Sequence, residues 1–136
     1  MKRKICFILM LVMILVASLQ VSLLASDASL YNNNTLRTYT SFVISDDGIA
    51  SVNVEYNGYS NITTGATISI TIEKRNFLLF WSDVVSDTIT VSGDFYSNEF
   101  TYQLEKSGTY RCTVEYVVSG TGGADDVITF EDTAEY

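Results

Sequence analysis

The chain has 136 residues, with eight Lys and Arg against sixteen Asp and Glu, so its formal net charge at pH 7 is −8. It contains no histidine. The missing histidine excludes Ser-His and Cys-His nucleophilic systems and histidine metal sites. The excess of acids predicts a soluble domain that does not bind nucleic acid and is repelled by anionic membranes.

The first 28 residues have the order of a secretory signal peptide. A basic start is followed by an apolar run from Ile5 to Ala17 and by small residues around the expected cleavage site, which lies between Ala25 and Ala28. We therefore expect export, and a secreted or cell-surface protein without a membrane span. The alternative is an uncleaved anchor, because the apolar stretch reaches Leu24 and could nearly span a bilayer.

Cleavage would change the charge and the cysteine content of the protein. From residue 27 onwards the chain carries five basic and sixteen acidic residues, a net charge of −11. Cys6 would leave with the leader, and Cys112 would then have no partner for an intramolecular disulfide. The hydrophobic core must therefore stabilise the domain without a disulfide.

Residues 29–38 are polar and without period, which predicts a disordered arm. We expect the β-sandwich domain to cover residues 39–136. Apolar and polar residues alternate in several short segments between turn signals, and this pattern predicts strands. The expected strands cover residues 39–44, 50–56, 66–72, a bulged segment at about 80–91, 99–105, 110–118 and 126–131, with an acidic tail after them.

Seven short strands without helices between them predict an all-β fold, an antiparallel sandwich of two sheets. Gly108, Tyr110 and Cys112 lie in a stretch that resembles the Gly-x-Tyr-x-Cys signature of strand F in immunoglobulin-type domains. The resemblance implies an immunoglobulin-like β-sandwich in which the Tyr110 hydroxyl bonds to backbone upstream, a tyrosine corner. The chain departs from that family because it has no second cysteine on the 50–56 strand, and because Trp81 comes too late for the strand C tryptophan.

Cys112 shares its face of the 110–118 strand with Tyr110, Val114 and Tyr116, so we expect a buried core residue. The alternative is a reactive thiol. The order of leader, Trp81, Gly-x-Tyr-Arg and acidic end is also similar to that of small secreted β-sandwich proteins of Gram-positive bacteria. That resemblance implies export from a bacterium and gives no activity.

The candidate contact residues form an unbroken apolar run, Phe77, Leu78, Leu79, Phe80 and Trp81. We expect alternate residues of this run to pack in the core. The alternative is an exposed patch, which on a secreted domain usually marks a contact surface. If Trp81 is exposed, its ring could stack on a sugar.

Two acidic pairs could supply oxygen ligands to calcium, Asp46 with Asp47 and Asp125 with Asp126. Neither pair has the regular spacing of a calcium loop, so we expect ordinary turn chemistry, no metal and no cofactor.

These observations predict an exported, non-catalytic module that acts by surface contacts with a protein partner or the cell envelope. The alternative is a carbohydrate-binding module that holds a cell-surface glycan on exposed aromatic residues around Trp81. A third reading is a small hydrolase with paired carboxylates, because sixteen acids in a short chain give such pairs by chance. The oligomeric state is left open.

Overall fold

The computed structural model describes residues 32–77 and 80–136, and the expected signal peptide lies outside the described residues. Within these ranges no helix is long and apolar enough to cross a membrane. The described chain forms seven strands: β1 (Thr35–Ile44), β2 (Ile49–Gly58), β3 (Thr63–Arg75), β4 (Trp81–Ser92), β5 (Phe95–Gln103), β6 (Thr109–Gly120) and β7 (Asp126–Glu135).

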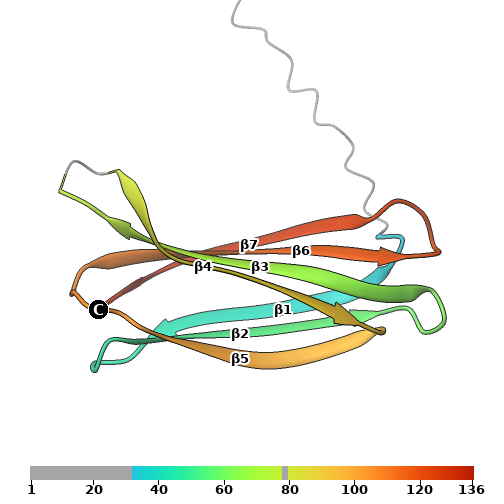
Figure 1. The fold of residues 1–136 in the computed structure, drawn as a ribbon, viewed down its shortest axis with the longest axis horizontal. Coiled ribbons are helices and arrows are strands. Elements are labelled where there is room, and N and C mark those ends of the chain that lie inside the picture. The colour runs from blue at the N-terminus through green and yellow to red at the C-terminus, as the bar shows by residue number, and fades with distance from the viewer. Residues whose placement is uncertain (1–31, 78–79) are drawn as a thin grey trace, which may run out of the picture. The chain divides into compact units, whose positions relative to one another are not determined.

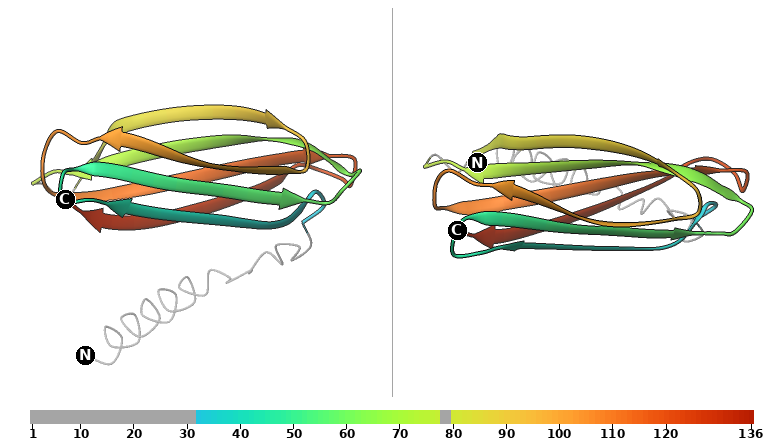
Figure 2. Two further views of the ribbon diagram at one scale, coloured as in Figure 1. Left: turned by 90° about the horizontal axis from the view of Figure 1, so that it is seen from below. Right: turned by 60° about the horizontal axis from the view of Figure 1, so that its bottom comes forward.

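The strands form two sheets that pack face to face (Figures 1 and 2). One sheet has three strands in the order β1-β2-β5, and the other has four in the order β4-β3-β6-β7. Every pair of neighbouring strands is antiparallel. The predicted fold class, an antiparallel immunoglobulin-like β-sandwich of seven strands, is therefore confirmed.

The core lies between the two sheets and follows the strand period of two. β2, β3 and β6 are the inner strands of their sheets, so alternate side chains on them are enclosed. This confirms the inward faces that the sequence predicts. The buried apolar side chains of these three strands are Ala50, Val52, Val54, Tyr56, Ala66, Ile68, Ile70, Ile72, Tyr110, Cys112, Val114, Tyr116 and Val118.

Both ends of the domain are strands where the sequence predicted irregular chain. β1 begins at Thr35, so the expected disordered arm at 29–38 is wrong from Thr35 onwards. β7 continues to Glu135 and takes in most of the expected acidic tail. Both segments are edge strands, which are held by backbone hydrogen bonds to one neighbouring strand. Such bonds do not depend on apolar side chains, so the polar composition of these segments does not predict a strand.

A buried carboxylate ties the start of β1 to the start of β7. The Asp126 side chain accepts backbone N–H bonds from Asn33 at 2.8 Å, Asn34 at 2.7 Å and Thr35 at 2.8 Å. Burial raises the pKa of Asp126, but the three N–H groups stabilise the charged form more, so its pKa lies below the usual range. The fully buried Asn34 adds bonds to the β6–β7 loop, to the Ala124 carbonyl at 3.0 Å and from the Gly122 N–H at 3.1 Å.

β6 holds the two tyrosines whose hydroxyls tie the sandwich together. The Tyr110 hydroxyl donates to the Lys106 carbonyl, which is the upstream backbone bond that we expected of a tyrosine corner. The Tyr116 hydroxyl reaches the opposite sheet, where it donates to the Tyr39 carbonyl at 3.2 Å and lies 2.6 Å from the Thr40 hydroxyl. Both aromatic rings are buried, so each hydroxyl needs these partners.

Cys112 lies in the core between these tyrosines and is fully buried. Burial raises the pKa of its thiol to about 12, and the charge of Asp132 adds to the effect. A thiol in this setting stays protonated at neutral pH, as expected of a core residue and not of a nucleophile.

Candidate contact site at the β3–β4 hairpin

The apolar run lies at the end of the β3–β4 hairpin, which bends away from the three-stranded sheet (Figure 1). The last cross-strand pair is Arg75 with Trp81. Beyond it, the Asn76 N–H donates to the Phe80 carbonyl at 2.9 Å, and the Phe80 N–H donates to the Asn76 side-chain oxygen at 3.1 Å. Asn76 therefore closes the loop with both its backbone and its side chain.

Closure at Asn76 leaves the aromatic rings of the loop outside the core. Phe77 is 89% exposed and Phe80 is 66% exposed. The expected core packing is therefore wrong for these two residues, because the loop lies beyond the last pair of the β3–β4 ladder, where no facing sheet covers it. Leu78 and Leu79 lie outside the described residues.

Trp81 is half-buried at the base of the loop, and a cation covers its ring. The Arg111 guanidinium lies 4.6 Å from the ring centroid. Its Nε and Nη2 atoms lie 2.7 Å and 2.6 Å from the same oxygen of Glu73. This ion pair fixes the guanidinium over the ring, so the covered ring is not free to stack on a sugar from that side.

The β4 bulge opens a cleft beside the hairpin. Ile72 pairs with Val85 and Glu73 with Asp83, which leaves Val84 as the extra residue of a bulge, as the sequence predicted for this strand. The cleft lies between the bulged strand and the turn that joins β5 to β6, and its inner part has a volume of about 370 Å³. Its lining residues are Lys74, Val84, Val85, Gln103, Leu104, Glu105, Lys106 and Tyr110.

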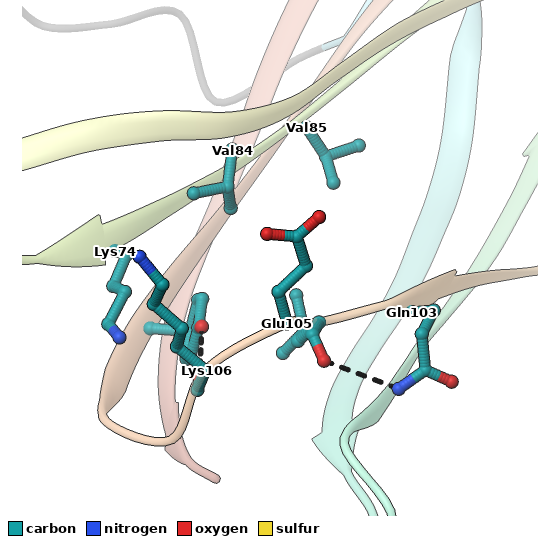
Figure 3. Close-up of a pocket in the computed structure, with 8 residues that line it drawn as sticks. Lys74, Val84, Val85, Gln103, Glu105 and Lys106 are labelled. Carbon is teal, nitrogen blue, oxygen red and sulfur yellow. Dashed lines mark hydrogen bonds between the residues drawn. The ribbon is translucent and has the colours of Figure 1, made fainter.

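An outer hollow of about 470 Å³ extends the cleft to Phe77. The two parts share Lys74, Val84 and Lys106. Figure 3 shows the two lysines on one side of the inner part, with the Glu105 carboxylate directed towards the valines. Lys74 is held there because its Nζ donates to the Ser107 carbonyl at 2.8 Å and lies 5.6 Å from the Tyr110 ring centroid.

The cations of the described chain gather at this end of the sandwich. Residues 32–136 contain five basic and fifteen acidic residues, yet four of the five cations lie on the hairpin, on β6 beside it or in the β5–β6 turn. Arg111 is neutralised by Glu73, whereas Arg75 and Lys106 are exposed. We call the surface formed by the other three cations of this end and the neighbouring aromatic residues the hairpin patch: Lys74, Arg75, Phe77, Phe80, Trp81 and Lys106.

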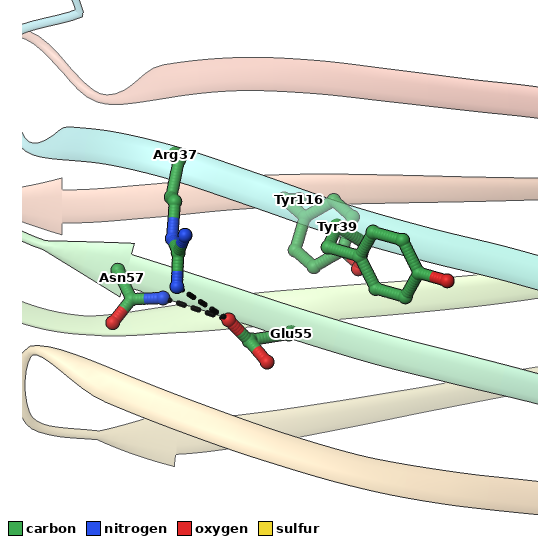
Figure 4. A network of polar contacts seen from close by, with 5 residues as sticks. All are labelled: Arg37, Tyr39, Glu55, Asn57 and Tyr116. Atoms are coloured by element: carbon green, nitrogen blue, oxygen red, sulfur yellow. Dashed lines mark hydrogen bonds and ion pairs between the residues drawn. The ribbon is translucent and has the colours of Figure 1, made fainter.

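The fifth cation lies on the outer face of β1, near the opposite end. Arg37 Nη2 lies 3.3 Å from a Glu55 oxygen, which also accepts a bond from the Asn57 amide at 2.9 Å (Figure 4). The Arg37 side chain is largely exposed, so this ion pair contributes little to stability. Figure 4 also shows Tyr39, which is exposed on the same strand. Its carbonyl accepts the bond from the Tyr116 hydroxyl.

The two acidic pairs lie at opposite ends of β1 and do not form a common site. Asp46 and Asp47 lie in the turn between β1 and β2, where the Asp47 carbonyl accepts a bond from Gln103 at 3.1 Å. Asp125 is exposed, whereas both oxygens of Asp126 are used by backbone N–H groups. In the described part of the chain, no three Asp, Glu or Cys side chains are grouped so that they could hold a metal ion.

The sequence identified the aromatic half of the hairpin patch and missed the cationic half. Lys74 and Arg75 directly precede the apolar run, which is a local signal that could have been used. Lys106 has no such signal, because it reaches the hairpin only through the pairing of β3 with β6, in which Lys74 lies opposite Tyr110.

Comparisons with known proteins assign no family to this chain. No protein-family model matches the sequence, and no curated protein matches it. Among solved structures, the chain is similar to a CARDB domain of a Pyrococcus furiosus protein that was crystallised in complex with di-metal ions. The match covers 76% of this chain and 96% of that one, at 13% sequence identity and a TM-score of 0.46.

Proposed function

We propose that the chain is an exported, non-catalytic β-sandwich module, and that it acts through surface contacts with a protein partner or the cell envelope. The contact surface is the hairpin patch. Export from a bacterium to a secreted or cell-surface location is part of the proposal and rests on the leader-like first 28 residues.

The exposure of Phe77 and Phe80 carries this proposal. Two phenylalanine rings that are 89% and 66% exposed lie on one short loop, next to the cleft and its lysines. Exposing large apolar side chains to water is unfavourable, and a partner that covers them removes this cost. A hydrogen-bonded loop that presents them outwards is therefore suited to contact.

A non-catalytic role is supported by the chemistry of the side chains near the cleft. The cleft combines lysines, valines and Glu105, and the chain has no histidine to act as a base. A hydrolase with paired carboxylates needs two acids facing one hollow. Glu105 is the acid among the residues that line the cleft, so a second acid would have to come from elsewhere.

The carbohydrate-binding alternative uses the same aromatic residues. Arg111 covers the Trp81 ring, so a glycan would have to stack on Phe77 or Phe80. These rings lack the polar groups that orient a sugar by hydrogen bonding. The alternative predicts that soluble cell-surface glycans compete with binding.

The proposal can be tested with residues 29–136, which contain both sheets and the whole described core and so form a folding unit. The segment is incubated with envelope preparations of the producing cells, and the retained fraction is measured. We expect the double variant Phe77→Ser, Phe80→Ser to be retained at least about tenfold less, since two exposed rings are lost. Phe95→Ser is the matched control, because Phe95 is also exposed but lies near the opposite end of the sandwich. Equal retention of the double variant and the control would refute the proposal.

A further inference from the structure

We propose that the chain forms a dimer through the outer edge of β5. In this dimer the β5 strands of two copies pair antiparallel, and they join the two three-stranded sheets into one continuous sheet. The surface is a different one from the hairpin patch, so this inference does not depend on the proposed function.

The outer edge of β5 carries backbone groups that point away from its own sheet. Among the described strands, β5 is the last of its sheet, so β2 pairs with one of its sides (Figure 1). The Leu104 N–H donates to the Gly48 carbonyl at 2.8 Å, and the Asp94 carbonyl accepts from the Gly58 N–H at 2.6 Å. The even-numbered residues of β5 therefore bond to β2. Backbone groups alternate in direction along a strand, so the odd-numbered residues from 95 to 101 direct theirs to the outer edge.

The middle of β5 is open to solvent. Ser97, Asn98 and Glu99 are all exposed, although consecutive residues of a strand lie on opposite faces of the sheet. In the neighbouring strand β2, by contrast, residues 50–58 are all buried or half-buried. A further strand can therefore align along the outer edge of β5.

The other three edge strands carry features that prevent pairing with another chain. β1 has a bulge at Leu36. β4 has a bulge at Val84 and an inward-facing acid, Asp87, opposite the buried Ile70. β7 has four acids among its ten residues. β5 has no bulge in its pairing with β2, and Glu99 is the single charged residue among its nine, so it lacks these protections.

The order of residues in β5 suits pairing with a second copy. If Asn98 lies on the two-fold axis, Tyr96 lies opposite Phe100 of the other copy, and Ser97 lies opposite Glu99. Tyr96 and Phe100 pack against the core of their own domain, and aromatic pairs opposite each other stabilise neighbouring strands. This register also keeps the two Glu99 carboxylates from lying opposite each other, as they would if Glu99 were on the axis.

The charge of the domain opposes association at low ionic strength. Residues 32–136 carry five basic and fifteen acidic residues. Asp83 and Asp87 lie on β4, and Asp87 accepts a bond from the Tyr102 hydroxyl of β5 at 3.1 Å, so these acids lie on the side of the sandwich where the copies would meet. Salt screens such repulsion and leaves a backbone ladder intact. The dimer should therefore become tighter as salt is added.

Sedimentation equilibrium of residues 29–136 at about 0.15 M and about 0.5 M salt measures the association. We expect a monomer–dimer equilibrium with a dissociation constant at least about threefold lower at the higher salt concentration. Asn98→Cys tests the register, because opposite residues at the axis have Cα atoms close enough for a disulfide. Mild oxidation should link this variant at least about tenfold faster than Thr129→Cys, an exposed site on the edge strand β7. Cys112 is buried and does not interfere.

Charge variants test which residues lie opposite each other. Ser97→Glu places a carboxylate opposite Glu99 of the other copy and should weaken the dimer about fivefold, whereas Ser97→Lys should strengthen it by a similar factor. Thr129→Glu adds the same charge on β7 and is the control for the change in net charge. Circular dichroism verifies that each variant is folded.

The inference is overturned if the segment remains monomeric up to about 1 mM, or if Asn98→Cys is linked no faster than Thr129→Cys. It is also overturned if Thr129→Glu weakens the dimer as much as Ser97→Glu does, because the copies would then associate through another surface. None of these results bears on the proposed function, since Phe77 and Phe80 lie outside β5.

Discussion

Replacing Asp126 by Asn should destabilise the sandwich although the two side chains have nearly the same shape. The carboxylate accepts three backbone N–H bonds from residues 33–35, one on Oδ1 and two on Oδ2. An Asn side chain has one acceptor oxygen, so its best orientation keeps two of the bonds and turns its own N–H towards the N–H of Asn33. The two retained bonds also lose the charge of the acceptor.

The magnitude follows from the number and type of these bonds. Hydrogen bonds to a charged group contribute about 1.5–3 kcal/mol each, and a buried donor without a partner adds a penalty of similar size. We expect Asp126→Asn to lower the free energy of unfolding by about 3 kcal/mol. For a domain of this size, that loss lowers the melting temperature by about 10 °C or more.

Urea and thermal unfolding of residues 29–136 measure the effect, with Asp125→Asn as the control. Asp125 is the adjacent acid and is exposed, so its replacement should change stability by less than about 0.5 kcal/mol. The reasoning is refuted if the two variants have the same stability, because the three N–H bonds would then contribute nothing.

The effect of Asp126→Asn on the free energy of unfolding should depend on pH. The pKa of Asp126 is lowered in the folded protein, so its stabilising effect is present above the pKa of the unfolded carboxyl, near 4, and is lost as the pH falls through the folded value. The stability difference between wild type and Asp126→Asn should therefore be constant near pH 7 and shrink below about pH 4. A difference that persists at low pH would mean that the carboxylate charge is not its source.

Three further predictions concern the core and the base of the hairpin. Tyr110→Phe removes the hydroxyl bond to the Lys106 carbonyl and should cost about 1 kcal/mol or more in urea unfolding, so a neutral result would show that the corner bond is not stabilising. Cys112 should react slowly with iodoacetamide in the folded segment and rapidly in urea, because the folded protein buries the thiol and raises its pKa to about 12. Fast labelling of the native form would contradict burial. Arg111→Lys should lower the free energy of unfolding by about 1 kcal/mol and shift Trp81 emission to longer wavelength. The reason is that an ammonium group cannot both bind Glu73 and cover the ring as the planar guanidinium does, and unchanged emission would refute the stacking.

The sequence by itself determined the strands and their inward faces. Alternation in the 50–56, 66–72 and 110–118 segments identified the buried side of three central strands, since a residue's side of a sheet depends only on its parity along the strand. The sequence also predicted a bulged strand at about 80–91, and the bulge lies at Val84. The resemblance of the stretch with Gly108, Tyr110 and Cys112 to immunoglobulin strand F implied the hydroxyl bond to upstream backbone.

Only the tertiary structure decided what lies at the two ends of the sandwich. Asp126 binds backbone more than ninety residues earlier in the chain, so nothing near residues 33–35 indicates that they are held. Phe77 and Phe80 look like core residues in sequence and are exposed because the loop extends beyond the paired strands. Lys106 joins Lys74 through the β3–β6 ladder. The Asp126 and Lys106 contacts join segments far apart in the chain, and the exposure of the two rings depends on where the β3–β4 pairing ends. None of these features gives a local period in the sequence.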